Sequence, residues 1–247
     1  MEDSKAKFFD KEYYRQRTYE LDTRYPSVRI IASVLVNKFR PEQVLDVGCA
    51  RGYLVYAFQE LGVESFGVDI SDYAIAHSPE SIRSRLQKVN VDSDELPFES
   101  ETFDMIASLE CMEHLQTPDH AISEMARVVK PGGIVAIIVP KTTLLSRLAK
   151  SALGRNPSHV SVLSKQSWLQ KFKSHGFSHI GDFVENEEKA IKRAFRNAER
   201  EKRRGFLPQN RIAYYFTKLG PFGKWLRAEL SFIFWPEEHL LFRLESK

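Results

Sequence analysis

Short apolar runs alternate with amphipathic segments along most of this chain. The runs have the character of buried strands and lie at 44–47, 65–69, 86–91, 103–109, 134–139, 177–184 and 238–244. Between most of them, apolar positions recur at helical spacing and predict helices over 27–40, 52–61, 71–76, 118–129 and 164–176. Nearly continuous apolar strands separated by amphipathic helices predict an α/β fold, a parallel sheet with helices on both faces. Because such crossovers are right-handed, we expect the sheet to be doubly wound.

Residues at the ends of these segments support the boundaries. Ser71 is placed as the N-cap of a short helix, and Ser164 begins another. Gly62 and Gly176 stand where helices stop. The run 130–133, Lys-Pro-Gly-Gly, predicts a turn before the fifth strand.

The chain divides into three regions. Residues 41–184 with 237–247 form the α/β domain, 1–40 form an N-terminal arm and helix, and 185–236 form an insertion before the last strand. The arm, over residues 1–26, is polar and aromatic. It either packs on the domain or closes over a site as a lid, since arms over a rigid scaffold often carry function.

The insertion is basic and aromatic. Residues 189–204 carry eight basic and two acidic side chains, and the stretch after Pro208 is rich in aromatic residues. At about 50 residues it is long for a simple connection, which typically spans roughly 2–6 residues. We expect a helical cap; the alternatives are a substrate lid, an interfacial surface for a lipid-like acceptor, and a nucleic-acid patch.

Composition narrows the function classes. The 247 residues carry a net charge of +3, which is too balanced to indicate a nucleic-acid binder. Cys49 and Cys111 make no disulfide framework, although the ends of strands one and four lie close in such a fold. The longest apolar run, 134–140, is too short to span a bilayer, and no secretory leader is recognised. We therefore expect a cytoplasmic protein.

A strand, a small-residue turn and a helix follow one another at 44–54, and this arrangement suits a nucleotide. A dinucleotide site would need glycine where Ala50 and Tyr53 stand, and no phosphate-binding Gly-Lys-Ser/Thr motif is present. Instead Asp46 precedes the turn, and Asp69 ends the second strand, where a carboxylate can bind a ribose diol. The expected ligand is a nucleoside with a cationic tail.

The chain resembles the class I, Rossmann-like S-adenosylmethionine-dependent methyltransferases of the small-molecule type. The family's Asp-x-Gly-x-Gly-x-Gly motif is matched by Asp46-Val47-Gly48-Cys49-Ala50-Arg51-Gly52, with alanine at the middle glycine. Further matches are the acids Asp69 and Asp92, and the segments 103–105, 110–115, 130–133 and 157–160. The resemblance covers about residues 41–184 and implies a seven-stranded, mostly parallel sheet whose last strand is antiparallel.

The resemblance implies S-adenosyl-L-methionine as cofactor, with S-adenosyl-L-homocysteine as product, and no metal. Asp69 is the ribose-binding acid of the family pattern and Asp92 its adenine-contacting acid, with Asp94 a near competitor for the latter role. The predicted cofactor-binding residues are Asp46, Gly48, Cys49, Ala50, Gly52, Asp69, Ile70, Val91, Asp92, Leu109 and Glu110.

Catalytic candidates follow the fourth strand. His114 either acts as a general base, because imidazole titrates near neutral pH, or only caps and packs the turn. His159, in a loop expected to overlie the site, is a comparable candidate. Together with His120, these histidines do not have the spacing of a metal site.

The predicted function is methyl transfer to an O, N or C acceptor of a small molecule or a lipid-like substrate. The alternatives are a non-catalytic binding or partner protein with this fold, and an RNA or protein methyltransferase that uses the basic insertion. DNA is not expected, because Ser108-Leu109-Glu110-Cys111 replaces the motif of adenine methyltransferases. RNA is not favoured; peripheral membrane contact through 185–236 and an oligomer are left open.

Overall fold

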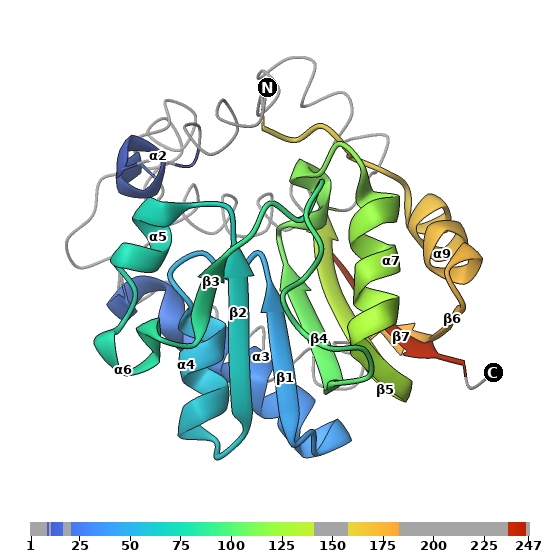
Figure 1. The fold of residues 1–247 in the computed structure, drawn as a ribbon, viewed down its shortest axis with the longest axis horizontal. Coiled ribbons are helices and arrows are strands. Elements are labelled where there is room, and N and C mark those ends of the chain that lie inside the picture. The colour runs from blue at the N-terminus through green and yellow to red at the C-terminus, as the bar shows by residue number, and fades with distance from the viewer. Residues whose placement is uncertain (1–8, 10, 17–20, 141–157, 183–236, 246–247) are drawn as a thin grey trace, which may run out of the picture.

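A seven-stranded sheet forms the centre of the computed structural model, which describes residues 9, 11–16, 21–140, 158–182 and 237–245 (Figure 1). The strand order is β3-β2-β1-β4-β5-β7-β6. The strands are β1 (Gln43–Val47), β2 (Glu64–Asp69), β3 (Leu86–Lys88), β4 (Phe103–Leu109), β5 (Val129–Pro140), β6 (Phe177–Asp182) and β7 (Glu237–Leu244). Only β7 runs antiparallel to its neighbours β5 and β6, so the predicted fold class is confirmed.

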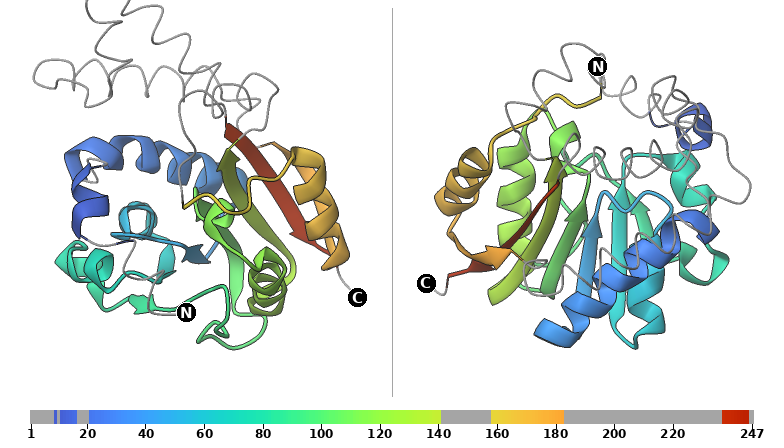
Figure 2. Two further views of the ribbon diagram at one scale, coloured as in Figure 1. Left: turned by 90° about the horizontal axis from the view of Figure 1, so that it is seen from above. Right: turned by 180° about the vertical axis from the view of Figure 1, so that it is seen from behind.

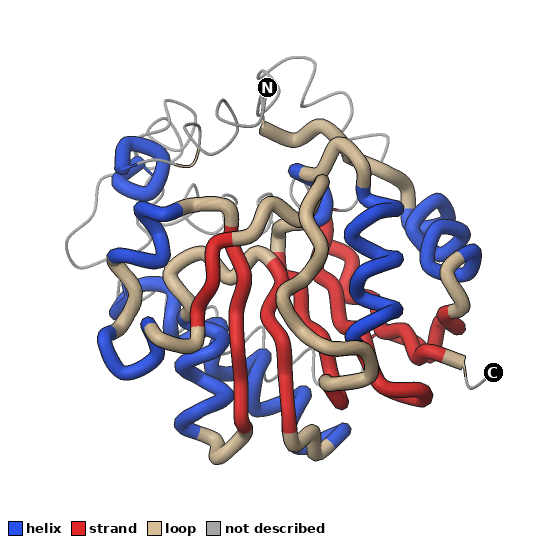
Figure 3. The backbone as a smooth tube through the Cα atoms, in the orientation of Figure 1, coloured by secondary structure: helices blue, strands red, loops and turns tan. Residues whose placement is uncertain are grey.

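Helices cover both faces of the sheet, as the alternating pattern predicts (Figures 2 and 3). They are α2 (Lys11–Gln16), α3 (Leu21–Phe39), α4 (Tyr53–Glu60), α5 (Asp72–Ala76), α6 (Glu80–Arg83), α7 (Pro118–Val128) and α9 (Lys165–Ser174), with a 3-10 turn η1 (Met112–His114). Helices α3 and α4 pack on one face, and α7 and α9 pack on the other. Of the helices in the described ranges, none is long and apolar enough to cross a membrane.

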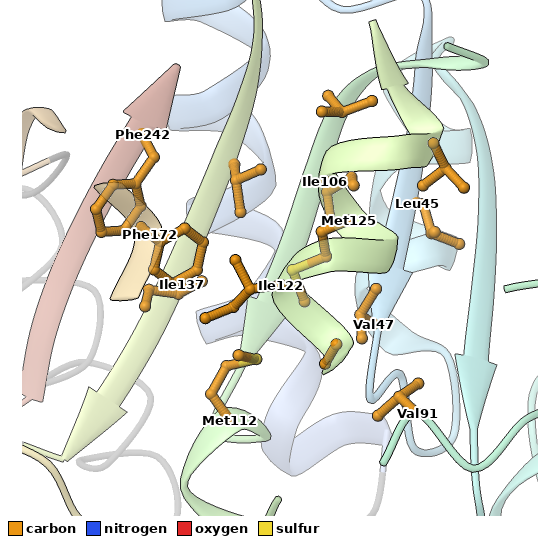
Figure 4. Close-up of a cluster of buried hydrophobic side chains, with 14 of the residues drawn as sticks. Leu45, Val47, Val91, Ile106, Met112, Ile122, Met125, Ile137, Phe172 and Phe242 are labelled. Carbon is orange, nitrogen blue, oxygen red and sulfur yellow. The ribbon is translucent and has the colours of Figure 1, made fainter. Parts of the chain in front are cut away.

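Successive side chains of the central strands point to opposite faces of the sheet and pack into two separate hydrophobic cores. In β5, Ile134, Ala136 and Ile138 pack with α3 and α4. The residues between them, Val135 and Ile137, pack with α7 and α9. Figure 4 shows this second core, in which side chains from α7, α9, β4 and β7 meet. Burial of both faces explains why these strands appear in the sequence as unbroken apolar runs.

Three predicted boundaries are wrong. Helix α3 begins at Leu21 instead of residue 27, and it carries Pro26 in its interior, at the cost of one backbone hydrogen bond. Strand β3 ends at Lys88, so 89–91 leave the sheet. Strand β5 already begins at Val129, and the predicted turn at 130–133 is a bulge within it.

The sheet has a switch point between β1 and β4. Strand β1 pairs in parallel with β2 on one side and with β4 on the other, so the chain winds outward in opposite directions from this pair. In open α/β sheets a crevice forms at the carboxyl ends of such strands. Residues 141–157 and the predicted insertion 185–236 lie outside the described residues, as does any contact they make.

Candidate cofactor cleft

Two adjoining hollows lie at the carboxyl ends of β1, β2 and β4. They share Gly48, Ala50, Leu109 and Glu110, so they form one cleft with two lobes. The first lobe is further lined by Phe9, Tyr13, Tyr14, Asp69, Ile70, Val89, Asn90, Val91, Asp92, Cys111, His114 and Leu115. The second is further lined by Arg24, Ser27, Val28, Ile31, Asp46, Cys49, Arg51, Tyr53, Leu54 and Ile138. Ten of the eleven predicted cofactor residues therefore line the cleft, and only Gly52 does not.

The turn after β1 requires glycine at its first position. Gly48 has φ +81°, and a Cβ there would lie 2.3 Å from Cys111 Sγ. The amides of Gly48 and Cys49 both donate to the carbonyl of Val68, at 2.8 and 3.0 Å. The turn is thus bonded to β2 and pressed against the segment that follows β4.

Alanine replaces the family glycine in a conformation that glycine prefers. Ala50 has φ +48°, and its amide donates to Asp69 Oδ2 at 2.8 Å. Gly52, with φ +70°, caps the start of α4. A Cβ on Gly52 would collide with the side chains of Ile82 and Leu86, so this glycine serves close packing behind the turn.

Two acids lie buried beneath this turn. Asp69 is 8% exposed and accepts hydrogen bonds from the amides of Ala50 and Ser71, both at 2.8 Å. Burial raises the pKa of Asp69, although these amides partly oppose the shift. Asp46 is 3% exposed, and burial together with the charge of Asp69 raises its pKa well above the usual range. A cationic group in the second lobe, which Asp46 lines, would oppose this shift by stabilising the ionised carboxylate.

The segment that leaves β3 contributes the far wall of the first lobe. Val91 and Asp92 line it as predicted, and Asn90 was missed because β3 was expected to continue to residue 91. Asp92 Oδ1 accepts from the amide of Thr117 at 2.8 Å, which ties this wall to the start of α7. Asp94 does not line the cleft and instead accepts from the amide of Asn90 at 2.9 Å.

The turn after β4 forms another wall of the cleft. Glu110 has φ +53°, and its amide donates to the carbonyl of Ile138 at 2.9 Å. Arg24 Nη1 lies 3.9 Å from Glu110 Oε2, which brings a residue of α3 to the cleft. Of the catalytic candidates, His114 lines the first lobe. The His159 ring lies edge-on to that of His114, with centroids 4.7 Å apart.

The sequence left open whether the arm packs on the domain or closes over a site, and it identified none of the arm residues that line the cleft. Phe9, Tyr13 and Tyr14 line the first lobe, and the Phe9 ring lies 5.4 Å from that of His114. The carbonyl of Phe9 accepts from Ser71 Oγ at 2.5 Å, so this part of the arm is also packed on the domain. The aromatic composition of the arm was the available signal, but no spacing connects it to the cleft. No feature of the sequence indicated that Arg24 and Arg51 would line the second lobe.

A family model described as a methyltransferase domain matches residues 13–180, which is more than half of the chain. The chain belongs to this methyltransferase family. The predicted resemblance to the class I S-adenosylmethionine-dependent methyltransferases is confirmed. The matched region of this methyltransferase domain includes all of the predicted cofactor residues and every residue that lines the cleft except Phe9.

Curated relatives of this methyltransferase domain have names that indicate different acceptors. Norajmaline N-methyltransferase of Rauvolfia serpentina is 30% identical over 132 residues, covering 51% of this chain and 44% of the relative. The mitochondrial ubiquinone biosynthesis O-methyltransferase of Schizosaccharomyces pombe is 30% identical over 128 residues, covering 49% and 46%. The chain thus spans about half the length of these relatives, and the match does not identify an acceptor.

A solved structure shares the fold of the methyltransferase domain. Phosphoethanolamine N-methyltransferase 2 of Haemonchus contortus, in complex with S-adenosyl-L-methionine, has a TM-score of 0.59 and 20% identity. The similarity covers 88% of this chain and 53% of that one. At this identity the comparison supports the fold alone.

Proposed function

We propose that this chain binds S-adenosyl-L-methionine in the two-lobed cleft and transfers its methyl group to an oxygen or nitrogen of a small molecule. The observation that carries the proposal is the placement of one acid in each lobe, Asp69 in the first and Asp46 in the second, beneath the glycine turn that both lobes share. Asp69 stands at the end of β2 in the first lobe, where it can accept from the ribose hydroxyls. Asp46 stands in the second lobe, where it can pair with the ammonium group of the methionine tail.

The second lobe also suits the other charge on that tail. Arg24 and Arg51 line it together with Asp46, so groups for an ammonium and for a carboxylate face one hollow. Guanidinium groups bind carboxylates through paired hydrogen bonds. We infer that the amino-acid tail enters this lobe and that the nucleoside fills the first.

The acceptor enters beside the aromatic arm and the turn after β4. Phe9, Tyr13 and His114 form this end of the first lobe, which supports a planar or cationic acceptor. The transfer depends on holding acceptor and sulfonium in line, and orientation supplies most of the acceleration. The roles of His114 and His159 as proton acceptors stay predictions, as do a carbon or lipid-like acceptor and membrane contact through 185–236.

Calorimetry with S-adenosyl-L-methionine tests the cofactor half of the proposal. We expect micromolar binding that Asp69→Ala weakens about a hundredfold, since hydrogen bonds to a charged group contribute about 1.5–3 kcal/mol each. Asp72→Ala is the matched control, because this exposed acid lies three residues away and pairs with Lys88. An absence of binding to the unmodified chain, or equal binding to the Asp69 variant, would contradict the proposal.

Radiolabelled cofactor tests the transfer itself. The chain would be incubated with a panel of phenols, catechols and primary, secondary and tertiary amines, and labelled products would be separated and identified. We expect label on an oxygen or nitrogen of at least one panel member. Tight cofactor binding with no transfer to any of them would favour the alternative, a binding protein that keeps the fold.

A further inference from the structure

Three metal-ligating side chains meet beside the acceptor end of the cleft. Glu113 and His114 come from η1, and His159 comes from the segment 158–163 that leads into α9. One ligand atom from each lies within 4.8 Å of the other two. Because 45 residues separate His159 from His114, local spacing along the chain gave no sign of this cluster.

Backbone contacts hold the two segments together. The amides of Val160 and Ser161 both donate to the carbonyl of Glu113 at 2.9 Å. Ser161 Oγ donates to the carbonyl of Leu115 at 2.6 Å. These bonds join the two segments next to the cluster, so the three side chains are presented by a backbone that is held in place.

The hydrogen bond made by His114 prepares its other nitrogen for a metal. His114 Nδ1 lies 2.9 Å from the carbonyl oxygen of Ser158. Because a carbonyl oxygen only accepts, this contact assigns the hydrogen to Nδ1 and leaves the lone pair of the neutral ring on Nε2. Metal-binding histidines are commonly oriented in this way, by a carbonyl or carboxylate on the nitrogen that does not bind the ion.

We propose that Glu113, His114 and His159 bind a divalent transition-metal ion such as Zn²⁺. Two imidazole nitrogens and one carboxylate oxygen suit zinc or iron, whereas magnesium and calcium prefer oxygen ligands alone. Glu113 is 1% exposed, and in such a weakly polar interior a carboxylate attracts a cation strongly. This inference replaces the expectation, based on sequence spacing, that no metal is bound.

The position of the ion beside the cleft gives it a further role that rests on the proposed function. His114 lines the first lobe, so an ion held on its Nε2 stands at the wall that the acceptor contacts. Three protein ligands leave coordination positions for water or for an oxygen of the acceptor, as in catalytic zinc sites. The ion would favour acceptors that carry an oxygen next to the methylated atom.

Cobalt titration tests the site without any need for activity. The chain is stripped with a chelator, and Co²⁺ is added while visible absorption is recorded. We expect saturation at one equivalent, with d–d bands typical of a low-coordinate N/O site, and displacement by Zn²⁺. Loss of a ligand in His159→Ala should weaken the affinity by more than about a hundredfold, because changes in the second shell already cost about 10–100-fold.

His120→Ala is the matched control, because His120 lies in the same region but directs Nε2 to the carbonyl of Asp94 at 3.1 Å. It should titrate like the unmodified chain, and His114→Ala should behave like His159→Ala. Circular dichroism and calorimetry with S-adenosyl-L-methionine on each variant report whether the fold is intact. Absence of cobalt bands, or equal cobalt affinity in His159→Ala and His120→Ala, would overturn the metal site, whereas failure to bind the cofactor would overturn only the proposed function.

Discussion

The two ends of the cleft are built in different ways. The end that we propose for the cofactor comes mainly from one continuous stretch, 43–71, in which a strand, a turn, a helix and a second strand follow one another. Arg24, Asp92 and Leu109 are added to it from other parts of the chain. Its contacts are backbone amides on buried oxygens, such as Ala50 on Asp69 and Gly48 on Val68. The acceptor end is assembled from three distant pieces: the aromatic arm at Phe9, the turn 110–115, and the segment 158–163.

This difference explains how one fold serves many acceptors. The cofactor end depends on local geometry, because residues at positive φ strain the turn unless they are glycine or as small as Ala50, and the two acids must stand at the ends of their strands. The acceptor end depends on side chains carried by segments that only meet in the folded chain, so their identity can change without disturbing the turn. Relatives that are named for an N-acceptor and for an O-acceptor fit this division.

The largest expected effect comes from Gly48→Ala, where the two ends touch. The new Cβ would lie 2.3 Å from Cys111 Sγ and 2.5 Å from Cys111 Cβ. We expect a loss of roughly 3 kcal/mol in the free energy of unfolding, from overpacking and the positive φ together. Cofactor affinity should fall by about a hundredfold or more, if the displaced turn also loses about that much binding energy.

Gly62→Ala separates the cost of a steric clash from the cost of a positive φ. Gly62 has φ +79°, close to that of Gly48, but a Cβ there meets nothing within 4 Å. Only the conformational cost of about 1 kcal/mol is expected, with unchanged cofactor affinity. Denaturant unfolding and calorimetry measure both quantities, and equal losses in the two variants would show that the contact with Cys111 is unimportant.

The next largest effect is a dependence of cofactor affinity on pH. Burial and the charge of Asp69 raise the pKa of Asp46, so without cofactor the folded chain retains a proton there above the usual range of an aspartate. The ammonium group of the cofactor favours the ionised form, so binding releases a proton. Affinity should therefore rise with pH, by up to about tenfold per unit, until Asp46 is ionised.

Calorimetry in buffers of different ionisation enthalpy measures the released proton directly. Asp46→Asn should reduce both the proton release and the pH dependence while weakening binding, and what remains would report on Asp69, whose pKa is also raised. The stability of the cofactor-free chain should show the opposite trend. A pKa raised on folding means that the native state binds more protons than the unfolded state, so stability falls as pH rises through this window. A flat pH profile of binding would exclude Asp46 from contact with the tail.

Most of the sheet follows from the sequence because it is encoded locally. Strand β4 is found at the predicted residues, and Ser71 accepts from the amide of Ala74 as the predicted cap of α5. The errors occur where tertiary contacts override a local signal. The apolar spacing predicted a helix that begins at residue 27, yet α3 begins at Leu21 and contains Pro26.

The same contrast between local and non-local contacts holds for the candidate site. Asp46, Gly48 and Asp69 are close in sequence and were predicted together, and all three line the cleft. His159 was predicted as a second candidate at this site, but the contacts of His114 with Phe9 and His159 were not, because the two residues approach it from opposite directions along the chain. No periodicity or motif connects such residues; only the folded sheet brings them together.

A smaller effect tests the acceptor end alone. Ser161→Ala removes the hydrogen bond from Ser161 Oγ to the carbonyl of Leu115 and should lower the free energy of unfolding by about 1 kcal/mol. Cobalt affinity should fall, because this bond helps to hold the segment of His159, while cofactor affinity should stay unchanged. Ser174→Ala, which loses an exposed bond to the carbonyl of Lys171, should change neither affinity. A loss of cofactor affinity in Ser161→Ala would show that the two ends are not independent.

The smallest effect is expected for Ala50→Gly, which restores the glycine of the family motif at the cofactor end. Ala50 holds φ +48°, a conformation that costs an alanine about 1 kcal/mol and glycine nothing. Ala50→Gly relieves this strain but increases the entropy of the unfolded chain, so we expect a net gain of under about 1 kcal/mol in the free energy of unfolding. Ala76→Gly, at the exposed end of α5, should instead lose up to about 1 kcal/mol. Denaturant unfolding of the two variants gives opposite signs if the turn is strained, and the same sign would mean that alanine fits it without cost.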